Sequence, residues 1–263
     1  MNNSPIGVFD SGVGGLSVFS RLIKLLPGEN YIYFGDTLNL PYGNKTKEQL
    51  VEISSGIFDF FKTKGVKAVV MACNTTSATV YDVLKSKYDF KIYPIVQNVS
   101  KCIAEKNYGA IGVFATLATV NSHAYKREIQ LYNKNTKVYE NACPEWVSIV
   151  EKSLWNEEKS IENIKMLLNK MLQNNVDKII LGCTHYPYLL EVLSKFAPEN
   201  MFIDPAERFA EFIFEDLSKN DMLNNGVFSK PEIYVSSNHE QFESASSLFY
   251  KVEKAREISL LKI

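Results

Sequence analysis

The chain has 263 residues, which is enough for one large domain or two modest ones with cores of their own. Its hydrophobic fraction of 46% and charged fraction of 22% are typical of a soluble globular protein. With 29 basic and 30 acidic residues, the formal net charge is −1, which gives no electrostatic reason to expect nucleic acid or an anionic membrane as a partner. The start of the chain is too polar for a signal peptide and no apolar run reaches the length of a membrane span, so we expect a cytoplasmic protein.

Short β-branched runs alternate with amphipathic stretches from the first residues onward. The predicted strands cover residues 5–9, 31–34, 68–72, 91–96, 110–114, 138–140 and 178–181. The predicted helices cover residues 15–26, 46–64, 75–87, 120–132, 161–174 and 188–196. A strand-like run at 231–236 and a helical run at 241–252 follow. This alternation predicts an α/β fold in which mostly parallel sheets are flanked by helices.

Part of the sequence is repeated within the chain. The segment Ile-Gly-Val-Phe at 6–9 returns at 111–114, and Val-Met-Ala-Cys-Asn at 70–74 is echoed by Ile-Leu-Gly-Cys-Thr at 180–184. A weaker echo joins 31–33 to 137–139. Buried parallel strands resemble one another, but three matches in the same order favour a true repeat.

The repeat predicts two pseudo-symmetric α/β lobes with an active site in the cleft between them. We expect the first lobe to comprise residues 1–97 together with a returning segment, 210–263, and the second to comprise residues 98–209. Ligands should bind at the carboxyl ends of the strands of both lobes.

Two cysteines occupy equivalent places in the repeat. Cys73 and Cys183 each follow a buried strand and precede a helix, so the helix N-terminus is expected to favour the thiolate and lower the thiol pKa. The four cysteines lie far apart without a C-x-x-C pair, which predicts free thiols and neither a disulfide framework nor a metal site. Cys102 and Cys143 lack the mirrored context, and we interpret them as packing residues.

Two thiols that approach one cleft from opposite sides suit the inversion of a stereocentre. One thiolate would remove the proton from an α-carbon, and the opposite thiol would deliver a proton to the other face. General acid–base catalysis near neutral pH requires partners for both groups. Asp10 is the expected partner of Cys73, and His185, two residues after Cys183, is the expected partner of Cys183.

A glycine-rich turn follows the first strand. Asp10 at its start has an alternative interpretation as the cap of the next helix. Gly12, Gly14 and Gly15 resemble part of a dinucleotide-binding loop, but Ser17 stands where the third glycine of that motif belongs. We therefore expect the backbone N–H groups of the turn to hold a carboxylate.

At these residues the sequence strongly resembles the glutamate racemase family, within the aspartate/glutamate racemase superfamily. In the first half, the matching motifs are Asp-Ser-Gly-Val-Gly-Gly-Leu at 10–16, Gly-Asp-Thr at 35–37, Pro-Tyr-Gly at 41–43 and Ala-Cys-Asn-Thr at 72–75. In the second half they are Thr116 with Thr119, Ala-Cys-Pro at 142–144 and Leu-Gly-Cys-Thr-His-Tyr-Pro at 181–187. They occur in family order and span most of the chain.

The resemblance implies a role for each matching residue. It makes Cys73 and Cys183 the two catalytic bases, with Asp10, His185 and Glu151 as assisting groups. The substrate-binding positions that it implies are Asp10, Ser11, Tyr42, Gly43, Asn74, Thr75, Thr116, Thr119, Thr184 and His185. The uncharged members suit an amino-acid zwitterion, although Thr116 and Thr119 are equally good helix caps, and Glu151 is a solvated helix carboxylate in the alternative interpretation.

The resemblance also implies an activity and its setting. Members of the family interconvert L- and D-glutamate without pyridoxal phosphate, metal or nucleotide, supply D-glutamate for bacterial peptidoglycan, and are commonly homodimers. Two segments depart from the family pattern. Val-Gln-Asn-Val-Ser at 96–100 replaces a Gly-Val-(Ile/Val)-(Glu/Asp)-Pro-like turn, and Leu-Asn-Leu at 38–40 replaces a small-His-Cys-type sequence.

Three alternatives remain open beside the interconversion of L- and D-glutamate. The same chemistry could act on aspartate or another small amino acid. A cysteine-nucleophile hydrolase or transferase would need one essential cysteine, whereas the repeat offers two. A non-catalytic amino-acid-binding relative would bind its ligand without turnover and would tolerate the loss of both thiols.

Overall fold

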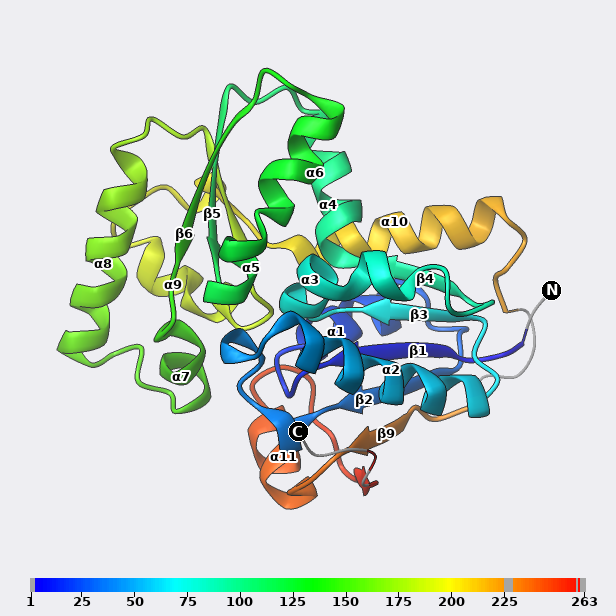
Figure 1. Ribbon diagram of the computed structural model, residues 1–263. Helices are drawn as coiled ribbons and strands as arrows, with labels where there is room; N and C mark the ends of the chain where they lie inside the picture. Colours follow the sequence, from blue (N-terminus) through cyan, green and yellow to red (C-terminus); the bar gives the residue numbers. More distant parts are fainter. Residues whose placement is uncertain (1–2, 225–228, 259, 261–263) are drawn as a thin grey trace.

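A computed structural model describes residues 3–224, 229–258 and 260, and its strands form two parallel sheets (Figure 1). The strand order in the larger sheet is β10-β9-β2-β1-β3-β4. Every neighbouring pair in it is parallel. Its strands are β1 (Ile6–Asp10), β2 (Tyr31–Gly35), β3 (Ala68–Met71), β4 (Lys91–Pro94), β9 (Glu232–Val235) and β10 (Arg256–Glu257).

The second sheet repeats the inner topology of the first. Its order is β6-β5-β7-β8, and all pairs are parallel. Its strands are β5 (Ala110–Ala115), β6 (Lys137–Ala142), β7 (Lys178–Gly182) and β8 (Phe202–Ile203). In both sheets the first strand lies between the second and the third, so the repeated segments at 6–9 and 111–114 occupy matching central strands. The two-sheet α/β architecture predicted from the repeat is confirmed.

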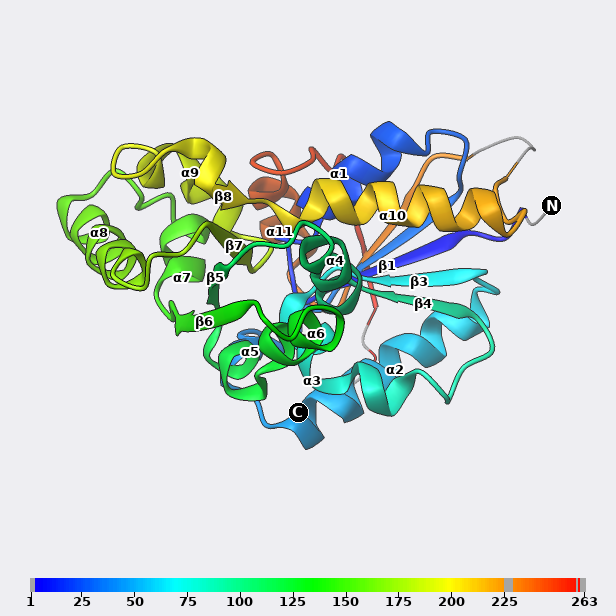
Figure 2. The same cartoon turned by 90° about the horizontal axis from the view of Figure 1, so that it is seen from above.

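Helices cover both faces of the first sheet. In Figure 2, α1 (Leu16–Leu25) and α10 (Pro205–Lys219) lie on one side of it, and α2 (Lys47–Thr63) lies on the other. A reciprocal capping box between Thr46 and Gln49 starts α2. The remaining helices are α3 (Asn74–Leu84), α4 (Ile95–Ala104), α5 (Leu117–Ser122), α6 (Ala124–Tyr132), α7 (Trp146–Glu151), α8 (Glu158–Leu172), α9 (Leu190–Leu193) and α11 (His239–Ser246). Short 3₁₀ turns are η1 (Thr37–Asn39), η2 (Tyr42–Asn44), η3 (Tyr186–Leu189) and η4 (Glu199–Met201).

The two sheets share a continuous apolar interior. One cluster of buried side chains joins Val8 of β1 and Val70 of β3 to Val113 of β5, with Phe209 of α10 in the same cluster. Each sheet also has an outer core of its own, which holds Phe61 in the first case and Trp146 in the second. The two halves of the molecule, one built around each sheet, are therefore packed against each other.

Four predicted elements differ from the observed ones. The helix predicted at 188–196 is the 3₁₀ turn η3 followed by the short helix α9, which ends at Leu193. The strand predicted at 91–96 ends at Pro94, which caps α4, so Ile95 and Val96 are helical. Apolar residues that favour a strand are equally suited to the buried face of a helix, and here the tertiary packing decides. The helix predicted at 120–132 is divided into α5 and α6, because His123 takes a left-handed conformation with φ of 50°. The helical run expected at 241–252 ends at Ser246.

We propose that each sheet with its helices forms one lobe, with residues 1–97 and 210–263 in the first and 98–209 in the second. The returning segment supports this division, because β9 pairs with β2 of the first sheet. Both boundaries fall within helices, α4 and α10. Residues 1–2, 225–228, 259 and 261–263 lie outside the described part of the chain. Among the described helices, none combines the length and the apolar character that a membrane crossing requires.

Candidate active site

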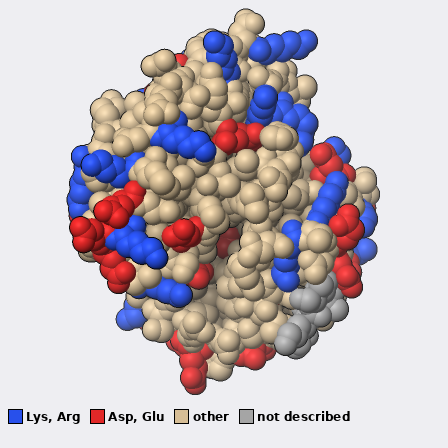
Figure 3. Space-filling view, turned by 60° about the vertical axis from the view of Figure 1, so that its left-hand side comes forward, with Lys and Arg blue, Asp and Glu red and all other residues tan. Residues whose placement is uncertain are grey.

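A pocket of about 680 Å³, counted to its open mouth, lies where the carboxyl ends of both sheets meet. On the face in Figure 3, charged side chains of both signs surround a hollow that is lined mainly by uncharged ones. The residues that line the pocket are Ser11, Leu40, Pro41, Tyr42, Gly43, Asn44, Cys73, Asn74, Thr75, Thr116, Leu117, Pro144, Val147, Cys183, Thr184 and His185.

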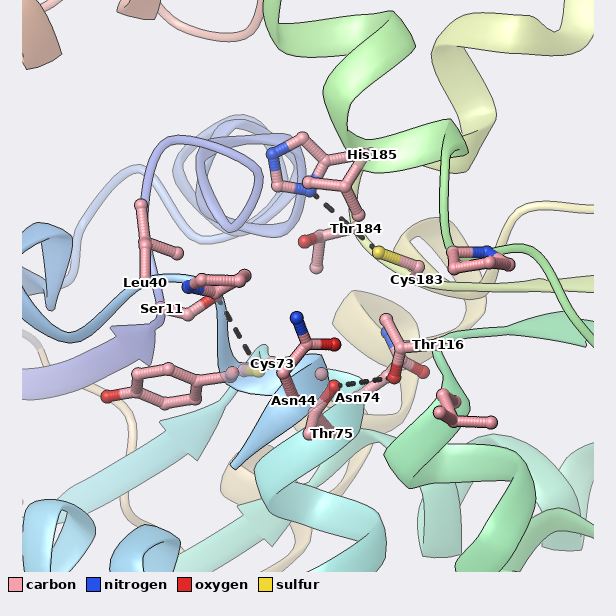
Figure 4. A pocket seen from close by; sticks show the side chains of 16 residues that line it. Ser11, Leu40, Asn44, Cys73, Asn74, Thr75, Thr116, Cys183, Thr184 and His185 are labelled. Atoms are coloured by element: carbon pink, nitrogen blue, oxygen red, sulfur yellow. Dashed lines mark hydrogen bonds between the residues drawn. The ribbon is translucent and has the colours of Figure 1, made fainter. Parts of the chain in front are cut away.

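The two cysteines of the repeat enter this pocket from different sheets (Figure 4). Cys73 follows β3 and stands at the N-cap of α3, and its Sγ is 3.9 Å from Ser11 Oγ. Cys183 follows β7, and its Sγ is 3.8 Å from Nδ1 of His185. Both cysteines are buried free thiols. The arrangement places one thiol on each side of any molecule that fills the pocket.

For Cys73, the expected lowering of the thiol pKa is wrong. Burial and the nearby charge of Asp10 raise its pKa to about 12, although hydrogen bonds from Thr76 at the start of α3 act in the opposite direction. Desolvation in the assembled pocket and the charge of Asp10 outweigh the helix N-terminus here and favour the protonated thiol of Cys73 at neutral pH.

His185 connects Cys183 to a carboxylate. Its Nδ1 faces the Cys183 sulfur, and its Nε2 lies 3.2 Å from Oε1 of Glu151 at the end of α7. Burial opposes the charged imidazole, but the hydrogen bonds to Cys183 and Glu151 outweigh it and raise the pKa of His185 to about 10. His185 is therefore an imidazolium at neutral pH, and its positive charge faces the Cys183 sulfur.

Asp10 lies at the end of β1, completely buried, and is held by the glycine-rich turn. Its carboxylate accepts hydrogen bonds from the backbone N–H groups of Gly12 and Gly15 and, at 3.5 Å, from Thr184 Oγ1. Burial raises the pKa of Asp10 to about 6, against the charge of His185, which lowers it. The N–H groups expected to hold a carboxylate thus hold that of Asp10, which acts on Cys73 through its charge.

Close packing explains two of the glycines in this turn. A Cβ at Gly14 would lie 2.5 Å from both the His185 ring and Thr184 Oγ1. A Cβ at Gly15 would lie 2.2 Å from Cβ of Asp10. Only glycine lets the turn from the first lobe touch the Cys183 motif of the second at this distance.

A chain of hydroxyl groups joins the two lobes at the edge of the pocket. Thr75 Oγ1 is 2.9 Å from Thr116 Oγ1, which is 3.0 Å from Thr119 Oγ1. Thr116 also caps α5, as its alternative interpretation predicts. Thr119 is fully buried behind Thr116 and does not line the pocket.

Asn74 presents a buried donor. Its Oδ1 accepts a hydrogen bond from the hydroxyl of Tyr125 in α6 at 2.7 Å, which fixes the orientation of the amide. Its Nδ2 is buried and has no hydrogen-bond partner in the described part of the chain. A buried N–H without a partner is costly, so this group favours a ligand with an acceptor oxygen in the pocket.

The Tyr42–Gly43 turn closes the pocket on the side of the first lobe. The Tyr42 hydroxyl donates to buried Asp36 at 2.5 Å, so it is not free for a ligand. The same carboxylate accepts hydrogen bonds from Asn39 and from Ser236, which follows β9. The unusual 38–40 segment thus adds a polar anchor for this turn, and Leu40 lines the pocket.

The structure brings most of the expected site residues together. Ten of them line the pocket, Asp10 and Glu151 adjoin it through Thr184 and His185, and Thr119 stands behind it. The sequence interpretation missed six lining residues: Leu40, Pro41, Asn44, Leu117, Pro144 and Val147. Most of them adjoin a recognised motif, and this proximity is the only feature of the sequence that could have indicated a place in the pocket.

Cys102 and Cys143 lie outside the pocket lining and are buried. Cys143 belongs to the outer core of the second sheet, where burial raises its thiol pKa. In the unusual 96–100 segment, Gln97 is hydrogen-bonded to Ser77 of α3 and not to the pocket lining.

Comparison with known proteins identifies relatives that match along the whole chain. The family model described as Asp/Glu/Hydantoin racemase matches residues 6–213. A glutamate racemase of Thermoanaerobacter pseudethanolicus is 38% identical over 100% of both chains. Glutamate racemase 2 of Caldanaerobacter subterraneus is 40% identical over 94% of both. The crystal structure of glutamate racemase from Francisella tularensis in complex with D-glutamate superposes with a TM-score of 0.92 at 32% identity, covering 99% of both chains.

Proposed function

This chain belongs to the Asp/Glu/hydantoin racemase family, and we propose that it interconverts L- and D-glutamate with Cys73 and Cys183 as the two acid–base groups. The observation that carries the proposal is the pair of thiols at equivalent strand ends on opposite sides of one pocket. Relatives named glutamate racemase, similar over the full length of this chain, support glutamate as the substrate.

The different surroundings of the two thiols suit complementary roles. In the proposed reaction Cys183, beside the His185 imidazolium, acts as the base that removes the α-proton from one enantiomer. Cys73, with its raised pKa, is the thiol that delivers a proton to the opposite face of the same carbon. In the reverse direction the roles exchange, and Asp10 and His185 balance the change of charge.

Removal of an α-proton without a cofactor needs strong stabilisation of the developing carbanion. The pocket offers preorganised donors for the substrate carboxylates, among them the unpartnered Nδ2 of Asn74 and the hydroxyls of Ser11 and Thr184. Burial of the site reduces competition from water, which strengthens each of these interactions. The ring of Tyr42 and the backbone of Gly43 contribute the shape of the opposite wall.

The cellular role follows from the product. We propose that the protein works in the cytoplasm as a homodimer, without cofactor, metal, nucleic acid or membrane partner, and supplies D-glutamate for peptidoglycan synthesis. The role of the glutamate racemase family in the bacterial cell wall supports this. Aspartate is the nearest competing substrate, and the names of the full-length relatives favour glutamate over it.

The direct test is exchange of the α-proton in D2O, followed by NMR and circular dichroism, with L- and D-glutamate and with L-aspartate for comparison. We expect glutamate to lose optical activity as deuterium enters Cα. Cys73→Ser and Cys183→Ser should each reduce racemisation by at least about 10³-fold, since a serine hydroxyl is a far weaker acid than a thiol and does not form the deprotonated base near neutral pH.

Cys102→Ser is the matched control, because Cys102 is a buried thiol outside the pocket. It should leave racemisation within about twofold. Turnover of aspartate alone would reject the substrate assignment and keep the chemistry. An α-proton that exchanges on no amino acid in the wild-type protein would reject the proposed activity.

A further inference from the structure

Glu151 lies between His185 and a second cavity that is distinct from the substrate pocket. This cavity, about 520 Å³ when counted to its mouth, is lined by Val13, Thr37, Leu40, Asn238, Gln241, Phe242 and Ala245 together with Glu151. Glu151 does not line the substrate pocket, and His185 does not line the second cavity. The pair His185–Glu151, with 3.2 Å between Nε2 and Oε1, therefore connects the two spaces.

The surroundings of His185 leave few other routes for its proton. The imidazole is 3% exposed, and Gly14 packs within contact distance of its Nδ1 side. Phe249, after α11, packs edge-on against the ring with 5.8 Å between centroids. The only partner found for Nε2 among the described residues is Glu151, whose side chain is 34% exposed.

The second cavity can hold the water that a proton exchange needs. It is large enough for several molecules, and Thr37, Asn238 and Gln241 provide polar groups on its walls. Among the described residues that line it, Glu151 is the only one with an ionisable side chain. Substrate in the first pocket would leave this cavity open, because the two share only Leu40.

We propose that His185 exchanges its Nε2 proton with water in the second cavity through Glu151 while substrate fills the first pocket. The proposal rests on the racemase function above and adds a proton route that is separate from the path of the substrate. It explains how a buried thiol–imidazole pair changes its protonation state without a net change of charge.

The proposed step starts from Cys183 as the thiolate and His185 as the imidazolium. When the thiolate takes the α-proton, an S–H bond forms, the C–H electron pair stays on the substrate carbon, and the pair carries one excess positive charge. The Nε2–H bond then breaks, its proton passes to Oε1 of Glu151 and from there to water, and His185 becomes neutral. In the reverse direction the Cys183 S–H bond breaks, its proton goes to the substrate carbon, and His185 regains a proton at Nε2 from water through Glu151.

The charged groups around His185 make this compensation necessary. Cys183, Glu151 and Asp10 all act on it, and burial disfavours any unpaired charge among them. Because its pKa is raised by the Cys183 and Glu151 hydrogen bonds, neutralisation of the Cys183 thiolate removes a main support of the imidazolium. Release of the Nε2 proton is the expected response.

The test is chemical rescue with formate, a small carboxylate that the second cavity can admit. Glu151→Ala should reduce kcat at least about 10-fold and increase the solvent deuterium isotope effect on kcat. Formate at molar-range concentrations should restore kcat by about fivefold or more, in proportion to its concentration. Glu145→Ala, the same substitution at an exposed glutamate beside the other end of α7, should change neither value.

A second variant checks the route. Ala245→Leu narrows the second cavity from α11 without removing a titratable group, so it should lower kcat by itself and abolish formate rescue in the double variant. Circular dichroism and the melting temperature confirm that each variant is folded. Folded Glu151→Ala without formate rescue, or equal rescue in the double variant, would overturn the proposal. If the wild-type protein does not racemise glutamate, the proposed function itself fails, which is a distinguishable result.

Discussion

At the scale of single residues, the site is governed by buried charge. Asp10 and His185 are fully buried, and their pKa values are raised to about 6 and about 10 by different balances of burial and partners. Burial dominates for Asp10, whereas for His185 the hydrogen bonds to Cys183 and Glu151 together outweigh the opposing effect of burial. The result is an anion beside the thiol of Cys73 and a cation beside that of Cys183, so two similar thiols have electrostatically different surroundings.

The raised pKa of His185 predicts a pH-dependent contribution to stability. Because the folded pKa of about 10 exceeds the unfolded value near 6.5, the contribution is fully present below pH 6.5 and disappears as the pH rises to about 10. Urea unfolding of wild type and His185→Asn should show a stability difference that shrinks by a few kcal/mol over this range. His123→Asn, at an exposed histidine, is the comparison variant. A wild-type advantage over His185→Asn that stays constant from pH 6.5 to 10 would contradict the prediction.

The two proposed acid–base thiols were the most predictable part of the site. Cys73 and Cys183 could be identified because each ends a repeated strand, where parallel sheets expose side chains. The orientation of Tyr42 could not, because it depends on Asp36 and Ser236, and Ser236 is far away in the sequence. The direction of the Cys73 pKa shift was also missed, since burial is a property of the assembled pocket.

At the scale of elements, the N-terminus of α3 is held by the start of α4. Ser77, four residues after the N-cap residue Cys73, donates to Gln97 Oε1 at 2.8 Å and accepts from the backbone N–H of Val96 at 3.0 Å. Gln97 Nε2 donates to the Ser77 carbonyl at 3.1 Å. These bonds hold the start of α4 against the turn that carries Asn74 and Thr75.

Loss of this contact should affect catalysis although Gln97 does not line the pocket. Gln97→Ala should lower the free energy of unfolding by about 1–2 kcal/mol and reduce kcat/KM several-fold. The reduction must be equal in both directions, because enantiomers have equal free energies in water. Asn98→Ala is the matched control in urea titrations and circular-dichroism assays. Among the described contacts, the side-chain amide of Asn98 donates to the carbonyl of Pro94, at the start of the same helix. Equal kcat/KM for the two variants would refute a positioning role for Gln97.

Helices and strands were predicted well where the residues of the element itself and its flanking turns determine its conformation. Each of the seven strands predicted before the C-terminal segment overlaps an observed one, because each combines β-branched residues with a sharp turn signal. Helices α4 and α10 were not predicted as such. Their apolar faces are buried between the two lobes, and Pro94 starts α4 directly after a strand without an intervening loop.

At the scale of the whole molecule, the shared core couples the two lobes. Side chains from both sheets and from α1, α4, α6 and α10 belong to one buried cluster. Direct hydrogen bonds cross between the lobes as well, from Tyr125 to Asn74 and from Ser17 to the carbonyl of Thr184. Two bodies that share an interior of this kind lose much of their own stability when they separate, so we expect them to unfold together.

Tryptophan fluorescence can test this coupling, because both tryptophans of the chain, Trp146 and Trp155, lie in the second lobe and report on its unfolding. Phe61→Ala removes a fully buried ring from the outer core of the first lobe and should cost about 3–5 kcal/mol. If the lobes unfold as one unit, tryptophan fluorescence and far-ultraviolet circular dichroism shift to the same lower urea midpoint. Phe114→Ala, the corresponding loss in the second lobe, serves as the control and should shift both signals in the same way. A tryptophan fluorescence transition that stays at the wild-type urea midpoint in Phe61→Ala would show that the second lobe is stable alone. The shared core would then be a contact surface between two units that unfold independently.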